Sequence, residues 1–503
     1  MSSLRSYIES WWNELPRPTA ARWASLFFSL HILTLLLSVA ASQAFLAAAT
    51  ITYLTHLLGL AIHQPADSGL RHVPSGTWHW PAVVFPLLKL PLLLFGLATF
   101  NSMLWAEHPA AGWVALRKLV LFVILLLSVN LVASAKHLGA LFRGLFFVSG
   151  LAGLLGIAQF LIQYQSVQRL HHNSIYFYMT LTRIHGFMGH WMNFGGQQML
   201  VFAALLAFLV LSHGGASSPP RREEGLGGGG GQNQDSANHP LAPSLTRRGI
   251  QKDREHGKAK VLYWLAMAVV ATSLILNFTR GAWLGCVVAT LYIVARWKPR
   301  ALWVIPFLVA LAYLAAPSML RRRLALTFHP KDDPALAIRL EMWNAGLRMV
   351  QKHPWVGVGP EHIPLVYAQY LPPGTTPLAG YHDHLHDNFL QLAAERGLPC
   401  LAVWLWFMLA LGWHILKIRR GLLSLRWVGD AALAAWLAFL AEGFSEFNFG
   451  ASPVLMVFLF VMSTPFIAQH LESRTTPPPH PTRADESAVA GHPLPQGGAG
   501  WEL

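Results

Sequence analysis

The sequence predicts an all-α polytopic membrane protein with about twelve transmembrane helices. Hydrophobic residues make up 54% of the 503 residues and charged residues only 12%, which is about half the roughly 25% charge of soluble proteins. The mean hydropathy is +0.41. The apolar residues gather in runs of about 20, the length of a helix that crosses a bilayer. This composition excludes a soluble enzyme.

Breaks rich in proline, glycine and charged residues separate the apolar runs and define the expected spans. These are 24–41, 44–62, 81–104, 113–134, 143–163, 193–212, 261–279, 282–297, 301–316, 398–416, 428–448 and 451–469.

Six segments follow from the spans. Residues 1–212 are expected to hold helices one to six, 213–260 a disordered cytoplasmic linker, 261–316 helices seven to nine, 317–397 a large periplasmic loop, 398–470 helices ten to twelve, and 471–503 a disordered cytoplasmic tail. The linker contains five consecutive glycines and almost no aliphatic residues, so it has little apolar surface to bury.

The net charge of +14 is distributed in a way that predicts orientation. Basic clusters in the short connections at 135–137, 296–300 and 417–426 are expected to stay in the cytoplasm. Polar residues then concentrate on the opposite face, which carries the loops 164–192 and 317–397. We therefore expect a site at the outer membrane–water boundary.

Two arginines stand out on that face. Arg280, in LILNFTRGAWLG, lies where spans seven and eight meet, and Arg183 precedes span six. A guanidinium group can bind two phosphate oxygens at once, and it keeps its charge. Arg183 and Arg280 together could therefore hold a diphosphate without a metal ion. The alternative for a single boundary arginine is contact with lipid headgroups.

The long loop contains an amphipathic helical pattern that begins at Arg339 and ends before Pro354 and Gly357. Arg339 and Arg348 on this helix are candidate contacts for phosphate or for an acceptor. The alternative is that both are solvated charges.

His386 opens a second helical pattern, which Gly397 interrupts before span ten. A histidine at a helix start just above the bilayer can act as a base near neutral pH, and the alternative is a structural hydrogen bond. The histidines at 382, 384 and 386 alternate, but a distant fourth ligand is missing, so no metal site is expected.

Glu442 and Glu446 lie one helical turn apart near the outer end of span eleven and could pair with an arginine or orient the histidine. Together with Lys89 they could form a proton relay, which leaves a lipid or solute transporter as an alternative of a different class. Arg117 and Lys118, near the outer end of span four, depart from the positive-inside pattern and indicate an anionic ligand there.

Three motifs in this order resemble the O-antigen ligase and polymerase superfamily, which includes bacterial O-linked oligosaccharyltransferases. They are FTRGAW around Arg280, R-x3-W-x10-P-x2-G-x-G from Arg339 to Gly359, and HDNFLQLAAERGL from His386 to Leu398.

The resemblance implies a fold similar to metal-independent, C-type membrane glycosyltransferases in the bacterial inner membrane, with a periplasmic active site. It implies transfer of O-antigen from undecaprenyl diphosphate to lipid A-core oligosaccharide, without a cofactor or nucleic acid. Arg183 and Arg280 would hold the diphosphate, and His386 would accept the proton of the attacking hydroxyl. In-line attack would invert the anomeric centre.

One departure keeps related enzymes open as alternatives. Cys400 and Leu401 stand where the ligase pattern has a glycine and a threonine. An O-antigen polymerase would use a second lipid-linked glycan as its acceptor, and a protein O-oligosaccharyltransferase would use a protein.

Overall fold

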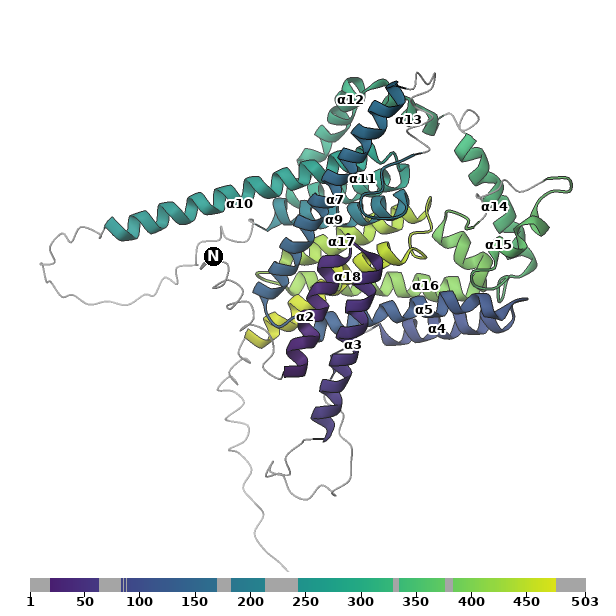
Figure 1. The fold of residues 1–503 in the computed structure, drawn as a ribbon, viewed down its shortest axis with the longest axis horizontal. Helices are drawn as coiled ribbons and strands as arrows, with labels where there is room; N and C mark the ends of the chain where they lie inside the picture. Colours follow the sequence, from purple (N-terminus) through teal and green to yellow (C-terminus); the bar gives the residue numbers. More distant parts are fainter. Residues whose placement is uncertain are drawn as a thin grey trace, which may run out of the picture.

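The fold of this chain is all-helical in the computed structural model. The structure describes residues 19–62, 83–84, 86, 88–169, 182–212, 243–328, 334–375 and 383–475. Every regular element in these ranges is a helix, which confirms the predicted all-α class. Figure 1 shows the helices as one bundle, from which part of α10 projects.

The first half contains α2 (Thr19–Thr34), α3 (Val39–Ile62), α4 (Lys89–Leu104), η1 (Pro109–Gly112), α5 (Trp113–Leu119), η2 (Val120–Phe122), α6 (Val123–Leu131), α7 (Ala135–Arg169) and α9 (Trp191–Leu211). The second half contains α10 (Pro243–Leu276), α11 (Arg280–Trp297), η3 (Pro299–Val304), α12 (Ile305–Ala315), α13 (Ser318–Phe328), α14 (Pro334–Lys352), α15 (Ile363–Val366), η5 (Tyr367–Tyr370), α16 (Asn388–Gly421), α17 (Arg426–Gly443) and α18 (Ser452–Thr475).

Six stretches of helix are long and apolar enough to cross a membrane: Val39–Leu60, Pro109–Leu131, Ala135–Arg169, Trp191–Leu211, Asn388–Gly421 and Ser452–Arg474. A helix also lies within each of the other six predicted ranges, where the apolar helices are shorter or less apolar. The membrane class is therefore supported, and the number of twelve crossings stays a prediction.

The centre of the bundle is formed by α9, α11, α17 and α18, which pack against one another. The buried face of α17 is rich in small residues, including Ala431, Ala434, Ala435 and Ala438, so neighbouring backbones approach closely. Helix α18 is buried on nearly all sides. The α4–α5 hairpin lies beside α16 in Figure 1, and α4 packs directly against α16.

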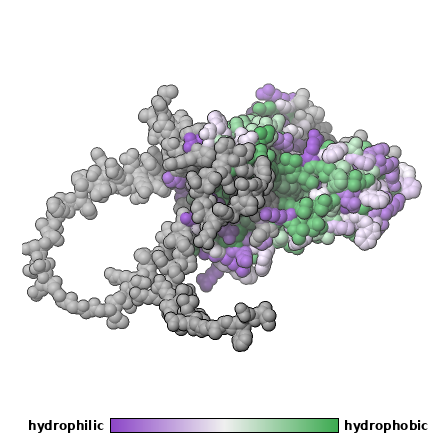
Figure 2. Space-filling model, turned by 90° about the horizontal axis from the view of Figure 1, so that it is seen from below, coloured by the Kyte–Doolittle hydropathy of each residue, from purple (hydrophilic) through white to green (hydrophobic). Residues whose placement is uncertain are grey.

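The outer helices expose large apolar side chains, among them Leu93 and Leu97 of α4 and Phe307 and Leu314 of α12. Figure 2 shows apolar residues gathered over the middle of one face, with polar residues towards one end. Such contiguous apolar surface is typical of contact with lipid rather than water.

Residues 334–375 and 383–397 form a packed helical unit, which we call the outer unit. Helix α14, the short α15 and η5, and the start of α16 share a hydrophobic core that includes Met342, Met349, Ile363, Tyr367 and Leu385. Helix α14 confirms the amphipathic helix predicted from Arg339, and it ends at Lys352, before Pro354. The unit therefore has the packing to hold side chains in fixed positions above the bundle.

Two predicted boundaries were wrong. Helix α10 begins at Pro243, so residues 243–260 of the expected disordered linker are helical. Their many Arg, Lys, Glu and Gln residues favour helix, and extension of an existing helix adds one hydrogen bond per residue. The tail begins later than expected because α18 continues to Thr475. Residues 213–242 and 476–503 lie outside the described part.

Candidate active site

Three segments that are distant in sequence meet at one buried carboxylate. Glu446, in the turn between α17 and α18, has one carboxylate oxygen, Oε1, 2.5 Å from Arg339 Nη2 on α14. Its other oxygen, Oε2, lies 3.0 Å from His386 Nδ1, just before α16. The arginine and the histidine proposed from sequence are thus joined through the glutamate that was proposed to orient them.

The conformation of His386 is fixed by its neighbours. The helix begins at Asn388, not at His386, which instead adopts a left-handed backbone with φ 51°. Asp387 caps α16 by accepting a hydrogen bond of 2.7 Å from the Leu390 amide. Leu385 donates its amide to Gln391 Oε1 and accepts from Trp343 Nε1 of α14, at 2.7 and 3.0 Å. A strained residue held from both sides is typical of a functional site.

Glu446 is an ionised carboxylate in a buried setting. Its side chain is only 4% exposed. Burial would raise the pKa of this group, but the charge of Arg339 and the hydrogen bond to His386 outweigh it and lower the pKa to about 2. Nδ1 of His386 therefore donates to a carboxylate, which leaves Nε2 as the basic nitrogen.

Glu442 has a different role from Glu446. Asn448 Nδ2 donates to Glu442 Oε2 at 2.9 Å, and Asn388 Nδ2 donates to Asn448 Oδ1 at 2.6 Å. Asn388 also accepts from the Phe449 amide. This chain of hydrogen bonds ties the turn that carries Glu446 to the start of α16, the helix next to His386.

Arg280 lies near Glu446 because the start of α11 packs closely against the turn that carries this glutamate. Arg280 is the first residue of α11, and only residues 277–279 separate it from α10. The connection is as short as predicted, but it lies before Arg280 rather than around it. A Cβ atom on the next residue, Gly281, would lie 2.5 Å from Ser445 Oγ and 3.2 Å from Glu446 Cγ. The missing side chain thus lets the N-terminus of α11 lie directly against the Glu446 turn.

Arg183 adds a further, partly buried guanidinium. Its Cζ lies 5.3 Å from the centre of the Trp191 ring. Burial, followed by the charges of Arg323, Arg339 and Arg280, lowers the pKa of Arg183 to about 9, while Glu446 acts in the opposite direction. The positive charges of four arginines therefore meet in the region around Arg183 and Glu446, where an anionic group would be stabilised.

Arg323 was not found from the sequence. It is the last of three consecutive arginines in α13, of which the first two are exposed, while Arg323 is only 5% exposed. A run of basic residues at a membrane boundary resembles a topology signal, so only the helix geometry shows which arginine faces inward.

The segment that carries Arg183 is held by two amide side chains, also missed from sequence. Gln159 of α7 accepts from the amides of His185 and Gly186 and donates to the Gly186 carbonyl at 2.9 Å. Asn277, at the end of α10, donates to the carbonyls of Ile184 and Trp191 at 2.8 and 3.2 Å. The two amides fix the backbone on both sides of residue 186.

A cavity of about 370 Å³ opens beside Glu446. Most of its lining residues are polar or charged, and they include His190, Asn193, His384, Gln391 and Asn448. Burial, then the charge of His386, lowers the pKa of His384 to about 3, and burial also lowers the pKa of His190. Both rings are thus neutral and can donate and accept hydrogen bonds.

Two of the three alternating histidines lie in the described part of the chain. The rings of His384 and His386 lie 4.2 Å apart, and His382 lies outside the described part. Among residues with described placement, no three His, Cys, Asp or Glu side chains are close enough to hold a metal ion.

Two further candidates are not brought to this group. Arg348 lies nine residues beyond Arg339, about 13 Å along α14, and its Nη1 donates to the Tyr370 carbonyl at 2.6 Å within the outer unit. Arg348 is therefore a partly buried contact within the outer unit rather than a solvated charge. Lys89 is the exposed first residue of α4, at the opposite end of that helix from its contacts with the outer unit.

Residues 265–405 of the chain match the family model described as O-antigen ligase. The matched range includes Arg280, Arg323, Arg339 and His386, whereas Arg183 and Glu446 lie outside it. No curated protein matches the chain.

Proposed function

We propose that this chain, a member of the O-antigen ligase family over residues 265–405, transfers O-antigen from undecaprenyl diphosphate to lipid A-core oligosaccharide. The observation that carries the proposal is the Arg339–Glu446–His386 group, in which a buried carboxylate bonds the histidine at 3.0 Å. It lies among arginines and opens beside a polar cavity at the end of an apolar bundle.

The arginines would bind the donor diphosphate. Arg183, Arg280 and Arg323 supply fixed positive charge close to Glu446. A diphosphate leaving group is already activated, so the main demand on the protein is to stabilise the negative charge that develops as it departs. No nucleotide-binding motif is needed for a lipid-linked donor, and the apolar bundle offers a route for the polyprenyl chain.

His386 would act as the general base. Nε2 takes the proton of the acceptor hydroxyl as its oxygen attacks the anomeric carbon, and the bond from that carbon to the diphosphate oxygen breaks with its electron pair on the diphosphate. The positive charge on the imidazole is then stabilised by Glu446. In-line displacement inverts the anomeric centre, and no metal ion takes part in this scheme.

Reconstitution tests the reaction. The purified chain, given lipid-linked O-antigen and rough lipopolysaccharide in a chelator and without nucleotide, should produce a ladder of extended lipopolysaccharide. A strict requirement for a divalent metal ion would overturn the mechanism.

A deletion strain identifies the acceptor. Free core without attached O-antigen supports the ligase. O-antigen limited to one repeat would instead indicate a polymerase, and normal lipopolysaccharide with an unglycosylated protein would indicate a protein O-oligosaccharyltransferase.

A further inference from the structure

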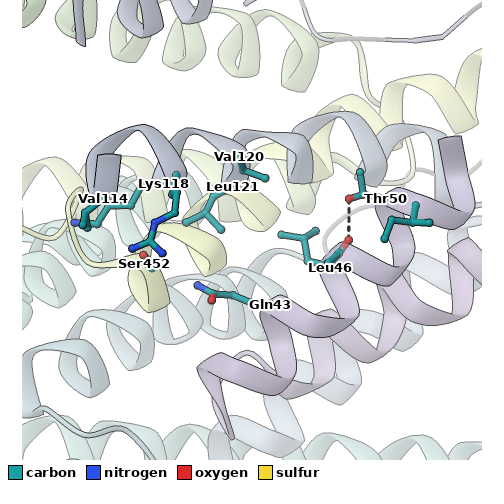
Figure 3. Close-up of a pocket in the computed structure, with 11 residues that line it drawn as sticks. Gln43, Leu46, Thr50, Val114, Lys118, Val120, Leu121 and Ser452 are labelled. Carbon is teal, nitrogen blue, oxygen red and sulfur yellow. Dashed lines mark hydrogen bonds between the residues drawn. The ribbon is translucent and has the colours of Figure 1, made fainter. Parts of the chain in front are cut away.

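An apolar groove of about 540 Å³ runs between α3 and the α5–η2 segment and reaches the start of α18. Figure 3 shows the two helices flanking it. Its apolar walls are formed by Leu46, Ala47, Ile51, Val114, Val120 and Leu121. Its shape and lining suit a hydrocarbon chain.

The positive charge of the groove lies at one end. Lys118, Val114 and Ser452 lie together at that end, Gln43 lies between the two ends, and Thr50 lies at the other end (Figure 3). Thr50 donates its hydroxyl to the Leu46 carbonyl at 2.8 Å, so it offers no free donor to a ligand. Arg117, which is exposed, joins Lys118 in the lining. The groove thus combines an apolar channel with two cations at its mouth.

The cationic end is continuous with the candidate active site. Lys118 lines both the groove and the polar cavity beside Glu446. Its Nζ lies 2.7 Å from Glu361 Oε1, and the two side chains are 26% and 32% exposed. A partly exposed ion pair contributes little stability, so an anionic ligand can replace Glu361 at low cost. Glu361 itself is held by its amide, which donates to Glu395 Oε1 at 2.9 Å.

The groove is separate from the arginines assigned to the donor. The charges that act on Arg183 come from α11, α13, α14 and the Glu446 turn, whereas α3, α5–η2 and the start of α18 line the groove. Lys118, Glu446 and His384 all line the polar cavity, and the His384 ring lies 4.2 Å from that of His386. The cavity therefore offers a second lipid an approach to the site.

We propose that this groove holds a hydrocarbon chain of the acceptor, a lipid with phosphate near its sugar, and that Lys118 and Arg117 bind that phosphate. This inference rests on the proposed function and extends it, because it assigns the acceptor to the lipids rather than to proteins. On binding, Lys118 exchanges Glu361 for the lipid phosphate at the border of the reaction cavity.

Steady-state transfer measures the effect. With rough lipopolysaccharide as acceptor, Lys118→Gln and Arg117→Gln should each raise the acceptor KM on the order of tenfold, while the donor KM stays unchanged. Lys118→Arg should retain most of the affinity. Glu361→Gln, which removes the competing carboxylate, should lower the acceptor KM. With rough lipopolysaccharide dephosphorylated on lipid A, the wild type should show the weak affinity of the variants.

A matched pair of bulky substitutions tests the apolar part. Ala47→Trp fills the groove and should raise the acceptor KM. Ala44→Trp adds the same bulk at an exposed position of α3 outside the lining and is the control. A rise in the donor KM alone in Ala47→Trp, or an equal effect of Lys118→Gln on phosphorylated and dephosphorylated acceptors, would overturn the assignment.

Direct binding separates this inference from the proposed function. Labelled rough lipopolysaccharide should bind the detergent-solubilised wild type and bind Lys118→Gln more weakly. If binding follows this pattern without transfer, the groove assignment stands and the ligase function fails. If transfer occurs but neither binding nor KM responds to Lys118, the ligase stands and the groove assignment fails.

Discussion

His386 Nδ1 lies 3.0 Å from Glu446 Oε2, and the same carboxylate binds Arg339 through its other oxygen. The carboxylate thereby fixes the ring orientation and leaves Nε2 as the free basic nitrogen. The arginine keeps the carboxylate ionised in a buried place. Catalysis by His386 should therefore depend on Glu446 even though Glu446 need not touch the substrates.

Glu446→Gln should slow transfer by about 10- to 100-fold, since a base loses the partner that stabilises its charged form. The loss should fall mainly on kcat, with both KM values little changed. Glu446→Asp should recover part of the rate. An unchanged kcat in Glu446→Gln would show that the histidine does not need the carboxylate.

The Arg339–Glu446 pair should be coupled in stability. Removing one partner leaves the other charged and buried, at a cost of about 3–5 kcal/mol. The double variant Arg339→Gln/Glu446→Gln should therefore be less destabilised than the sum of the two single variants. Denaturant unfolding of all four proteins in detergent measures this coupling, and strict additivity would contradict a direct pair.

The contribution of Glu446 to stability should depend on pH in one direction. Its pKa is lowered from 4.5 to about 2 in the folded protein, so its stabilising effect is complete above the unfolded value and is lost as pH falls through the folded value. The difference in Tm between wild type and Glu446→Gln should shrink as the pH falls below about 4. A difference that grows on acidification would contradict the assignment.

Asn277→Asp should lower activity through Arg183. The substitution keeps the size of the side chain but removes the two amide hydrogens that bind Ile184 and Trp191. We expect kcat to fall about tenfold, since each hydrogen bond contributes about 1 kcal/mol and both fix the same segment. Thr290→Val, on α11 away from this segment, is the control. Unaltered kcat in Asn277→Asp would show that Arg183 is positioned by other contacts.

Gly397→Ala should strongly destabilise the junction between the outer unit and α16. Gly397 has φ 81°, and an added Cβ would lie 2.3 Å from the Trp355 carbonyl oxygen. Strain of this kind costs about 1–3 kcal/mol before any clash is added. Gly421→Ala in the same helix has nothing within 4 Å and should leave Tm nearly unchanged. Equal effects of the two substitutions would contradict the crossing of residues 355 and 397.

The sequence predicted the parts of this molecule that have a local signal. Apolar runs predicted the helices, and scarce charges at their ends pointed to Arg183, Arg280, Arg339, His386 and Glu446. It could not show that Glu446 bridges Arg339 and His386, because this contact joins residues 107 and 60 positions apart.

Two of the other contributors, Arg323 and Gln159, have no distinguishing pattern in the sequence. Arg323 looks like its two neighbours, and only the rotation of α13 buries it. Gln159 and Asn277 both hydrogen-bond to the backbone of the segment around Arg183. Asn277 is remote from that segment in the sequence. The polar residue Asn277 at the end of an apolar run was a usable signal, whereas Gln159 in the middle of α7 was not.

The most direct test of the account is transfer by His386→Ala in a reconstituted assay. The wild type and the variant are given lipid-linked O-antigen and rough lipopolysaccharide in the presence of a chelator, and the extended product is measured over time. The account predicts that the wild type transfers glycan and that the variant is slower by about 10²- to 10⁴-fold, the usual contribution of a general base. Full activity in His386→Ala would contradict it.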